Sequence, residues 1–343
     1  MTGSASVALA VAAGLLAGTG AGTADPADVP DEGRVVLTFA DERIAESSGL
    51  VARDGLVLTV NDSGDGPVVY VVDEATGETV GTSTYPADPD DVEALAPGRR
   101  AGDVWVGDIG DNERARTTVA VHRLTGVGRG DRTVPAASYE LRYPSRPRDA
   151  EALLVHPRTG RVLVVSKELI GSGTVYRAPA RLDPGAIHRL EPVARAPRMV
   201  TDGAFLPDGR HVLLRTYGSA VLYTYPGFEV VAEAELPEQE QGEAVAVDPA
   251  GRVLVSTEGA GSEVLEVAAP TRPTPPSAGP TASPEPETLR SDDPRTPRRR
   301  LADAADPAPG DGDGVWLPGL ALAALGAVGL GLRVARRRSR RRR

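Results

Sequence analysis

Acidic or hydroxyl side chains begin five short apolar runs of the chain, and a second polar side chain follows each of them 13 to 16 residues later. The first set is Ser48, Glu93, Glu151, Asp202 and Glu243. The second set is Asn61 with Asp62, Asp108, Lys167, Arg215 and Glu258. Carboxylates that lie close together raise one another's pKa, so a gathered set needs partners. Cationic side chains, a hard metal ion bound through oxygen ligands, or backbone N–H groups would each provide them.

Lys167 and Arg215 interrupt the acidic pattern and are the candidates for holding an anion or for catalysis. The segments 61–65 and 108–112 are rich in Asp, Asn and Gly, as calcium loops are, but they lack EF-hand spacing. We take Ca²⁺ as the candidate ion. The predicted metal ligands are Glu93, Asp108, Glu151 and Glu243. The predicted ligand-binding residues are Asn61, Asp62, Asp108, Asp111, Asn112, Lys167, Arg215 and Glu258.

Several other kinds of chemistry have no signature in the sequence. The chain has no cysteine, which excludes disulfides and thiolate metal sites. Its four histidines are scattered over different positions and form no zinc motif. Neither a Gly-x-Ser-x-Gly nucleophile elbow nor a phosphate-binding P-loop is present.

The five polar pairs belong to a repeated unit of two apolar strands joined by a glycine-containing turn. The unit starts are 45, 58, 51 and 41 residues apart. Asp-Gly and Pro-x-Gly turns between β-branched runs are typical of β-hairpins, and one or two further strand-like runs follow each hairpin. Four strands in about 40 to 50 residues is the size of one β-propeller blade.

We therefore predict an all-β fold, a five-bladed β-propeller, over residues 25–269. The last unit supplies only three strands, so the run 34–39 is predicted to complete the fifth blade and close the ring. Six blades are the alternative if a long repeat contains another blade, and an immunoglobulin-like sandwich is the second alternative. Closure would bring both polar sets to one mouth of the central channel.

The two ends of the chain predict export and anchoring. Residues 1–24 contain a 12-residue apolar run followed by small residues, which is typical of a signal peptide. Residues 270–314 are rich in proline and predict an extended stalk. The uncharged run within 315–335 predicts a transmembrane helix, because an arginine-rich tail, 336–343, follows it. The propeller would stand outside the cell membrane and the C-terminus in the cytoplasm.

Charge is divided unequally along the chain. The net charge is −10, although the last eleven residues hold eight arginines. The part that precedes this tail is therefore strongly acidic, and it should repel nucleic acid and attract cations. The predicted partners are the membrane, through the C-terminal helix, and an extracellular ligand or protein.

Four segments resemble those of secreted actinobacterial β-propellers described as WD40-like or as related to the esterase-like phytase group. They are Glu46-Ser47-Ser48-Gly49-Leu50, Asn61-Asp62-Ser63-Gly64, Asp91-Val92-Glu93-Ala94-Leu95 and Gly107-Asp108-Ile109-Gly110-Asp111-Asn112. The resemblance covers about residues 33–267 and concerns the fold, since Trp-Asp dipeptides are absent. It implies an acidic rim on which Lys167 and Arg215 would supply the basic part of a phosphate site.

Two functions follow from these observations. In the first, the acidic rim binds a ligand or a protein, with Ca²⁺ as the candidate ion, and no reaction is catalysed. In the second, the rim is a metal-dependent hydrolase site for phosphate esters or lactones, in which Lys167 or Arg215 holds the anion. Structural capping of backbone N–H groups by the repeated acids is the third interpretation, and it needs no ligand.

Overall fold

The computed structural model describes residues 32–62 and 65–271, which form 22 β-strands and no helix. Four antiparallel strands make each of five blades, written here from the channel outward. Blade 1 is β2 (Ser47–Arg53), β3 (Leu56–Asn61), β4 (Val68–Asp73) and β5 (Thr79–Thr84). Blade 2 is β6 (Val92–Pro97), β7 (Val104–Asp108), β8 (Val119–Leu124) and β10 (Ala136–Arg142). Blade 3 is β11 (Ala150–Val155), β12 (Val162–Ser166), β13 (Gly173–Arg177) and β15 (Glu191–Ala196). Blade 4 is β16 (Val200–Phe205), β17 (His211–Thr216), β18 (Ser219–Thr224) and β19 (Val230–Glu235). Blade 5 is β20 (Gly242–Val247), β21 (Val253–Thr257), β22 (Glu263–Val267) and β1 (Arg34–Thr38).

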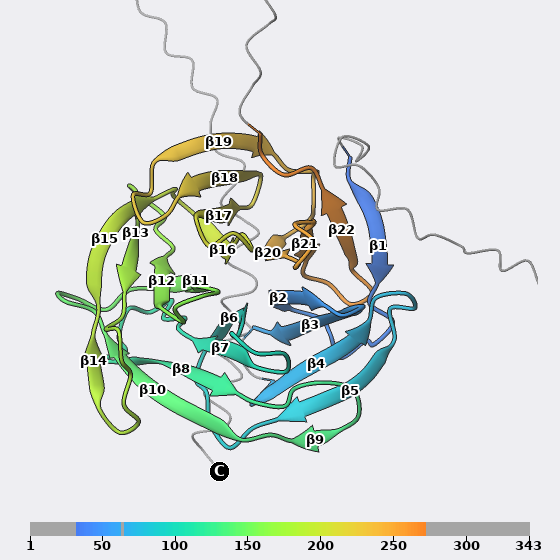
Figure 1. The fold of residues 1–343 in the computed structure, drawn as a ribbon, viewed down its shortest axis with the longest axis horizontal. Helices are drawn as coiled ribbons and strands as arrows, with labels where there is room; N and C mark the ends of the chain where they lie inside the picture. The colour runs from blue at the N-terminus through green and yellow to red at the C-terminus, as the bar shows by residue number, and fades with distance from the viewer. Residues whose placement is uncertain (1–31, 63–64, 272–343) are drawn as a thin grey trace, which may run out of the picture. The chain divides into compact units, whose positions relative to one another are not determined.

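The N-terminal strand closes the ring. β1 is the outermost strand of blade 5 and pairs antiparallel with β22, the last strand of the chain. The innermost strands β2, β6, β11, β16 and β20 surround the centre of the disc in Figure 1. The predicted five-bladed propeller with an N-terminal closing strand is confirmed, and the six-bladed and sandwich alternatives are wrong.

Two short strands tie neighbouring blades together at the outer edge. β9 (Arg132–Thr133) leaves the β8–β10 connection of blade 2 and pairs in parallel with β5 of blade 1. β14 (Ile187–Arg189) leaves blade 3 and pairs in parallel with β10 of blade 2. Both strands cover an outer edge that would otherwise expose unpaired backbone groups.

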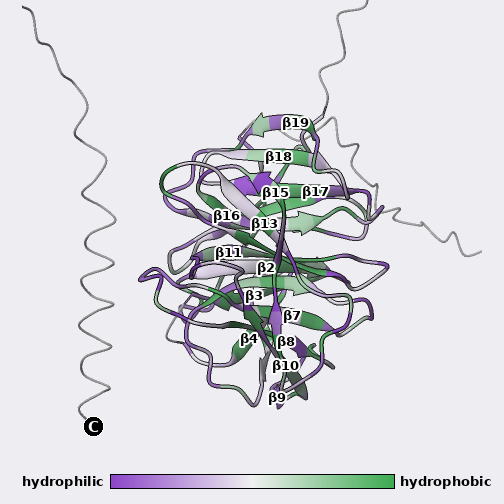
Figure 2. Ribbon diagram, turned by 90° about the vertical axis from the view of Figure 1, so that its left-hand side faces the viewer, coloured by the Kyte–Doolittle hydropathy of each residue, from purple (hydrophilic) through white to green (hydrophobic). Residues whose placement is uncertain are grey.

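The hydrophobic core lies between the blades and is divided into five clusters, one for each pair of neighbouring blades. Leu213 of blade 4 packs in one cluster with Val255 of blade 5, and Leu254 of blade 5 packs in another with Leu50 of blade 1. The strands are largely apolar and the connecting loops carry much of the hydrophilic character, as Figure 2 shows. Because an apolar layer fills each of the five interfaces, burial of apolar surface stabilises the closed ring as a whole.

A register irregularity recurs at the start of every innermost strand, where β2, β6, β11, β16 and β20 meet the channel mouth. The residues that fall in the irregular step are Ser48, Glu93, Glu151, Thr201, and Glu243 with Ala244. A bulge of this kind turns a side chain away from its regular direction and is frequent beside functional sites. The irregularity thus gives Glu93, Glu151 and Glu243 equivalent places at the starts of their strands, whereas Thr201 of blade 4 donates to the carbonyl oxygen of Glu243.

Pairing in blade 4 corrects the repeat alignment made from the sequence. Val200 pairs with Thr216, as Ala150 pairs with Ser166 in blade 3. The equivalents of Glu151 and Lys167 are therefore Thr201 and Tyr217, whereas the sequence alignment used Asp202 and Arg215. The physical reason is the place of the turn glycine: the connection is equally long in blades 3 and 4, 156–161 and 206–211, but Gly209 stands one residue earlier in it than Gly160 does. A shift of one residue moves a strand side chain to the opposite face.

The predicted signal peptide, the transmembrane segment and the basic tail lie outside the described residues, as does the stalk from residue 272 onward. No helix in the described part of the chain is long and apolar enough to cross a membrane. The propeller belongs to a compact unit, Met1–Ser277, and a second unit, Ala278–Arg343, falls among residues that are not described.

Candidate metal and ligand site at the channel mouth

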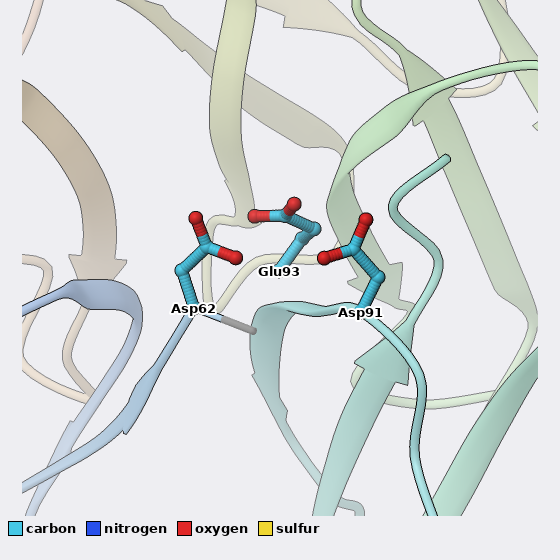
Figure 3. A group of neighbouring side chains, drawn as sticks. All are labelled: Asp62, Asp91 and Glu93. Atoms are coloured by element: carbon cyan, nitrogen blue, oxygen red, sulfur yellow. The ribbon is translucent and has the colours of Figure 1, made fainter. Parts of the chain in front are cut away.

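Three buried carboxylates meet between blades 1 and 2. Asp62 follows β3, Asp91 precedes β6, and Glu93 is the bulged residue of β6. One oxygen from each lies within 4.8 Å of the others, and their residues are 4 %, 5 % and 2 % exposed. The carboxylates are turned toward one another across the opening (Figure 3). We name Asp62, Asp91 and Glu93 the acidic triad.

Electrostatics disfavour three negative charges at this place. Burial is the largest cause that raises the pKa of Glu93 well above its ordinary value, and repulsion from Glu151, Asp62 and Asp91 raises it further. Its hydrogen bond from the hydroxyl of Ser48 is long, 3.4 Å to Oε2. A proton on Glu93 or a divalent cation beside it would relieve this repulsion.

Gly110 forms one wall of the acidic triad. Its backbone N–H donates to the carbonyl oxygen of Asp91, 3.1 Å, the bond that Lys167 makes to Asp149 in blade 3. A Cβ atom at Gly110 would lie 2.6 Å from Glu93 Oε1 and 2.7 Å from Asp91 Oδ2. The absence of a side chain at this position therefore lets both carboxylates pack against the backbone of Gly110.

A cation and a phenol lie on the side of the mouth formed by blades 3 and 4. Lys167 Nζ donates to Glu151 Oε1 at 2.9 Å and lies 5.2 Å from the centroid of the Tyr217 ring. Burial lowers the pKa of Lys167, but Glu151, Glu243 and Tyr217 raise it more, so its net shift is well above the ordinary value. Lys167 is thus a fixed positive charge opposite the acidic triad, and Tyr217, 37 % exposed, is reached from solvent.

Glu243 of blade 5 completes the polar ring. Its Oε1 accepts from Gln241 Nε2 at 3.3 Å, while its buried Oε2 has no hydrogen-bond partner among the described residues. Burial is the largest cause that raises the pKa of this carboxyl, and Lys167 opposes it. The ring therefore contains a second carboxylate whose charge is incompletely stabilised.

Asp108 and Asp111 are engaged in holding the loops of blade 2. Asp108 Oδ1 accepts from the backbone N–H of Asp91 at 2.9 Å and forms an ion pair with Arg116 at 2.9 Å. Asp111 accepts from the N–H groups of Ala115 and Arg116, both at 2.9 Å. Neither belongs to the acidic triad. Asp108 positions Asp91, which does.

The remaining predicted ligand-binding residues lie apart from the acidic triad. Asn61 donates to the carbonyl oxygen of Arg43 and to Asp65, and accepts from the N–H of Glu46. Asn112 is exposed on the β7–β8 loop, and Glu258 is half-buried directly after β21. The structure thus gives Asn61 a loop-closing role.

Asp202 and Arg215 are fully buried between blades 4 and 5, at 0 % exposure. Asp202 accepts from the N–H groups of Gly203, 2.7 Å, and Val245, 2.8 Å. Arg215 donates to the carbonyl oxygens of Ala244 and Ser256 and to the side chain of Gln239. Arg215 therefore has no surface to offer a ligand, and Asp202 is the backbone cap that the third interpretation expected of every blade.

The structure adds two residues to the site that the sequence analysis had not assigned to it. Asp91 stands two residues before Glu93, and its role depends on the strand beginning at Val92. Tyr217 is found only through the corrected register of blade 4. Tyr217 is located by the strand pairing, since it follows Thr216, the partner of Val200, whereas counting from the turn glycine leads to Arg215.

Comparison with known proteins gives little beyond this geometry. No family model matches the chain, and no curated protein matches it. Two solved structures described as glucose dehydrogenase are similar to 68 % and 66 % of this chain and to 99 % and 97 % of their own, with TM-scores of 0.40 and 0.39. They are 11 % and 12 % identical to it, a likeness that carries no argument about activity. Membership of the phytase-related propeller group is not confirmed.

Proposed function

We propose that this protein is a membrane-anchored, extracytoplasmic β-propeller that binds Ca²⁺ at Asp62, Asp91 and Glu93 and uses the bound ion to hold an anionic ligand. The observation that carries the proposal is the convergence of three buried carboxylates within 4.8 Å, with a glycine in front of them. Burying negative charges close together is costly, and a bound cation would offset the repulsion that Glu93 meets from Asp62 and Asp91.

The donor set favours a hard ion. Carboxylate oxygens suit Ca²⁺, which takes about six to eight oxygen ligands in flexible geometry. Three side chains leave most of these positions to water or to oxygens of a ligand. A phosphate, sulfate or carboxylate group could thus bind the ion directly, and Lys167 lies within electrostatic range of the acidic triad. The ligand class that fits is an extracellular molecule carrying such a group.

The test is the melting temperature of the purified chain in Ca²⁺ and in EDTA. Saturation at about 100 times the dissociation constant would add about 2.7 kcal/mol of stability by linkage. For a domain of this size that corresponds to a rise of about 5 to 10 °C. Asp62→Asn should remove the rise. Asp111→Asn, which alters a buried carboxyl outside the acidic triad, should keep it.

An equal melting temperature with and without Ca²⁺ would refute the metal site. Magnesium at the same concentration is an additional control, because it prefers a tight octahedral shell and retains its water. A shift with Ca²⁺ that Asp62→Asn leaves unchanged would place the ion elsewhere and would equally contradict the proposal.

The anchoring part of the proposal depends on the segments predicted at the chain ends. Deletion of residues 315–343 should release the propeller from the membrane fraction into the medium, since the apolar run and the arginine tail are together the predicted anchor. Recovery of the shortened chain in the membrane fraction would contradict this part without affecting the metal site.

A metal-dependent hydrolase of phosphate esters or lactones is the second candidate. The observation in its favour is the pair Lys167 and Tyr217, a cation and a partly exposed phenol close to Glu151 and Glu243 of the polar ring. A hydrolase should show Ca²⁺-dependent turnover on a panel of esters and lactones, and Lys167→Ala should abolish it. Absence of turnover at every Ca²⁺ concentration would leave the binding function.

A further inference from the structure

We propose that Leu169 and Ile170, named here the apolar tip, dock the propeller on a membrane surface that contains anionic lipid. The apolar tip is the middle of the connection between β12 and β13, which lies on the mouth face of blade 3. Leu169 is 67 % exposed and Ile170 is 91 % exposed. Large apolar side chains are seldom left so open in adjacent positions unless another surface covers them.

The base of the apolar tip is held firmly although its end is open. Glu168, directly before the tip, is buried and forms ion pairs with both Arg114 and Arg148. Its carbonyl oxygen accepts from the N–H of Met199, and Gly173 after the tip donates to the carbonyl oxygen of Pro197. These contacts fix the loop between its two neighbours, so the two apolar side chains are presented outward by a supported turn.

Cationic side chains outnumber acidic ones in three of the loops around the apolar tip, whereas the fourth, 109–118, is balanced, with Asp111 and Glu113 against Arg114 and Arg116. The three loops of this sector, 143–149, 167–172 and 197–199, carry four cationic and two acidic side chains: Arg146, Arg148, Lys167 and Arg198 against Asp149 and Glu168. Both acids are buried. The loops 39–46, 85–91 and 236–241 of the same face carry more acidic than basic residues.

Two of these cations are available to an outside partner. Arg146 and Arg198 are exposed, and neither has an ion pair or side-chain hydrogen bond among the described residues. Apolar side chains between unpaired arginines are the combination that binds the interface of an anionic bilayer, where the apolar part enters the acyl boundary and the cations remain at the headgroups.

A lipid surface fits this feature better than a protein does. The apolar tip is a protrusion with almost no surrounding protein surface at Ile170, so a protein partner would need a matching pocket, whereas lipid deforms around it. Two signals are generally needed for stable attachment. A chain already tethered by the proposed C-terminal anchor would meet the bilayer at high effective concentration, so a weak contact of this size would suffice.

The absence of cysteine makes the test direct, because one introduced cysteine is the sole labelling site. The full chain carrying Ile170→Cys is labelled with an environment-sensitive dye and reconstituted in vesicles of phosphatidylcholine, or of phosphatidylcholine with a quarter phosphatidylglycerol. We expect the dye emission to shift to the blue and to rise about twofold or more only in the anionic vesicles. Val230→Cys is the matched control, an apolar residue of β19 that is 61 % exposed, and it should not respond.

The possible outcomes distinguish an anionic lipid surface from a second copy of the chain as the partner that covers the apolar tip. Arg146→Gln with Arg198→Gln should return the emission at position 170 to its value in neutral vesicles. An equal response in both kinds of vesicle, or no response in either, would overturn the proposal. A response that follows protein concentration in place of lipid charge would show that a second copy covers the tip, and would overturn it too. Flotation of the labelled chain reports the anchor separately.

Discussion

Glu93 and Asp202 are both fully buried carboxyls at the mouth ends of innermost strands, yet their surroundings are opposite. After burial itself, everything near Asp202 except Glu243 favours its charge: the N–H groups of Val245 and Gly203, and then Arg215. Near Glu93 the next causes are Glu151, Asp62 and Asp91, which all oppose its charge. Burial raises the pKa of both carboxyls well above the ordinary value, but the other groups near Asp202 mostly favour its charge and those near Glu93 mostly oppose it.

The difference teaches how a repeated fold separates structure from function. Asp202 occupies the register position of Gly49 and Ala94, where neighbouring inner strands approach closely. A Cβ atom at Gly49 would lie 2.2 Å from the backbone nitrogen of Leu95, which shows how little room this position leaves. Asp202 uses that closeness to bond the next blade. Glu93 is one residue earlier in register, in the bulge, and faces the channel.

The largest expected effect is the loss of the Asp202 cap. Asp202→Ala would leave two buried N–H groups without acceptors, each costing about 1–3 kcal/mol, and would remove a negative charge that favours the buried charge of Arg215. We expect the free energy of unfolding to fall by about 3–5 kcal/mol. Urea denaturation measures it. A loss below about 1 kcal/mol would show that the cap is not structural.

Asp202→Ala should leave the stabilisation by Ca²⁺ intact. The gain in stability on adding Ca²⁺ should equal that of the unaltered chain, because Asp202 lies between blades 4 and 5 and the acidic triad between blades 1 and 2. If the Ca²⁺ response disappeared in a variant that still folds, the two carboxyls would belong to one system.

The second prediction concerns Glu93→Gln, which should stabilise the metal-free chain where Asp202→Ala destabilises it. A carboxyl whose pKa is raised on folding contributes stability at low pH that is lost as pH rises from the unfolded pKa through the folded one. In EDTA the unaltered chain should therefore lose stability as pH rises above the ordinary glutamate value of 4.5. Glu93→Gln removes one cause of this loss, so it should stabilise the metal-free chain at pH 8 by about 1 kcal/mol.

Thermal unfolding of both chains across pH, with EDTA and with Ca²⁺, checks this prediction. Glu93→Gln should be the more stable chain in EDTA and the less stable one in saturating Ca²⁺, since the variant gains nothing from the ion. Asp202, whose pKa is also raised by burial but which does not figure among the causes at Glu93, remains in both chains and cancels in the difference. Destabilisation by Glu93→Gln in EDTA at pH 8 would mean that its charge is already satisfied by the protein.

The fold could be predicted from the sequence because each blade repeats the same local chemistry. Hairpin turns with glycine, apolar strands and a fixed polar boundary recur five times, and the strand at 34–38 had no other edge to complete. The strands β9 and β14 could not be predicted, since Arg132–Thr133 and Ile187–Arg189 pair with the preceding blade through contacts that no local pattern encodes.

The structure brings some of the predicted site residues together, and the different register of blade 4 has one physical cause. Glu93 and Asp62 were recognised as mouth residues, and the acidic triad confirms that they meet. Arg215 was chosen in place of Tyr217 because the turn glycine of blade 4 stands one residue earlier in a connection of the same length, so an alignment on that glycine misplaces the residues after it. Sequence spacing cannot reveal a displaced turn glycine, whereas backbone pairing shows the register directly.

The smallest effect tests whether the space in front of the acidic triad matters. Gly110→Ala adds one methyl group that would lie 2.6 Å from Glu93 Oε1, so the carboxylates must separate or the β7–β8 loop must move. Because metal ligands need correct placement, we expect Ca²⁺ affinity to fall about tenfold, which equals about 1.4 kcal/mol. Titration calorimetry with Ca²⁺ measures this affinity.

Gly218→Ala is the control, since Gly218 also lies on the mouth face and a Cβ atom there would meet nothing within 4 Å. Its affinity should be unchanged. If Gly110→Ala bound Ca²⁺ as tightly as the unaltered chain, the ion would not lie beside Gly110. Glu93 would then not be a ligand, and it would differ from Asp202 only in the charges around it.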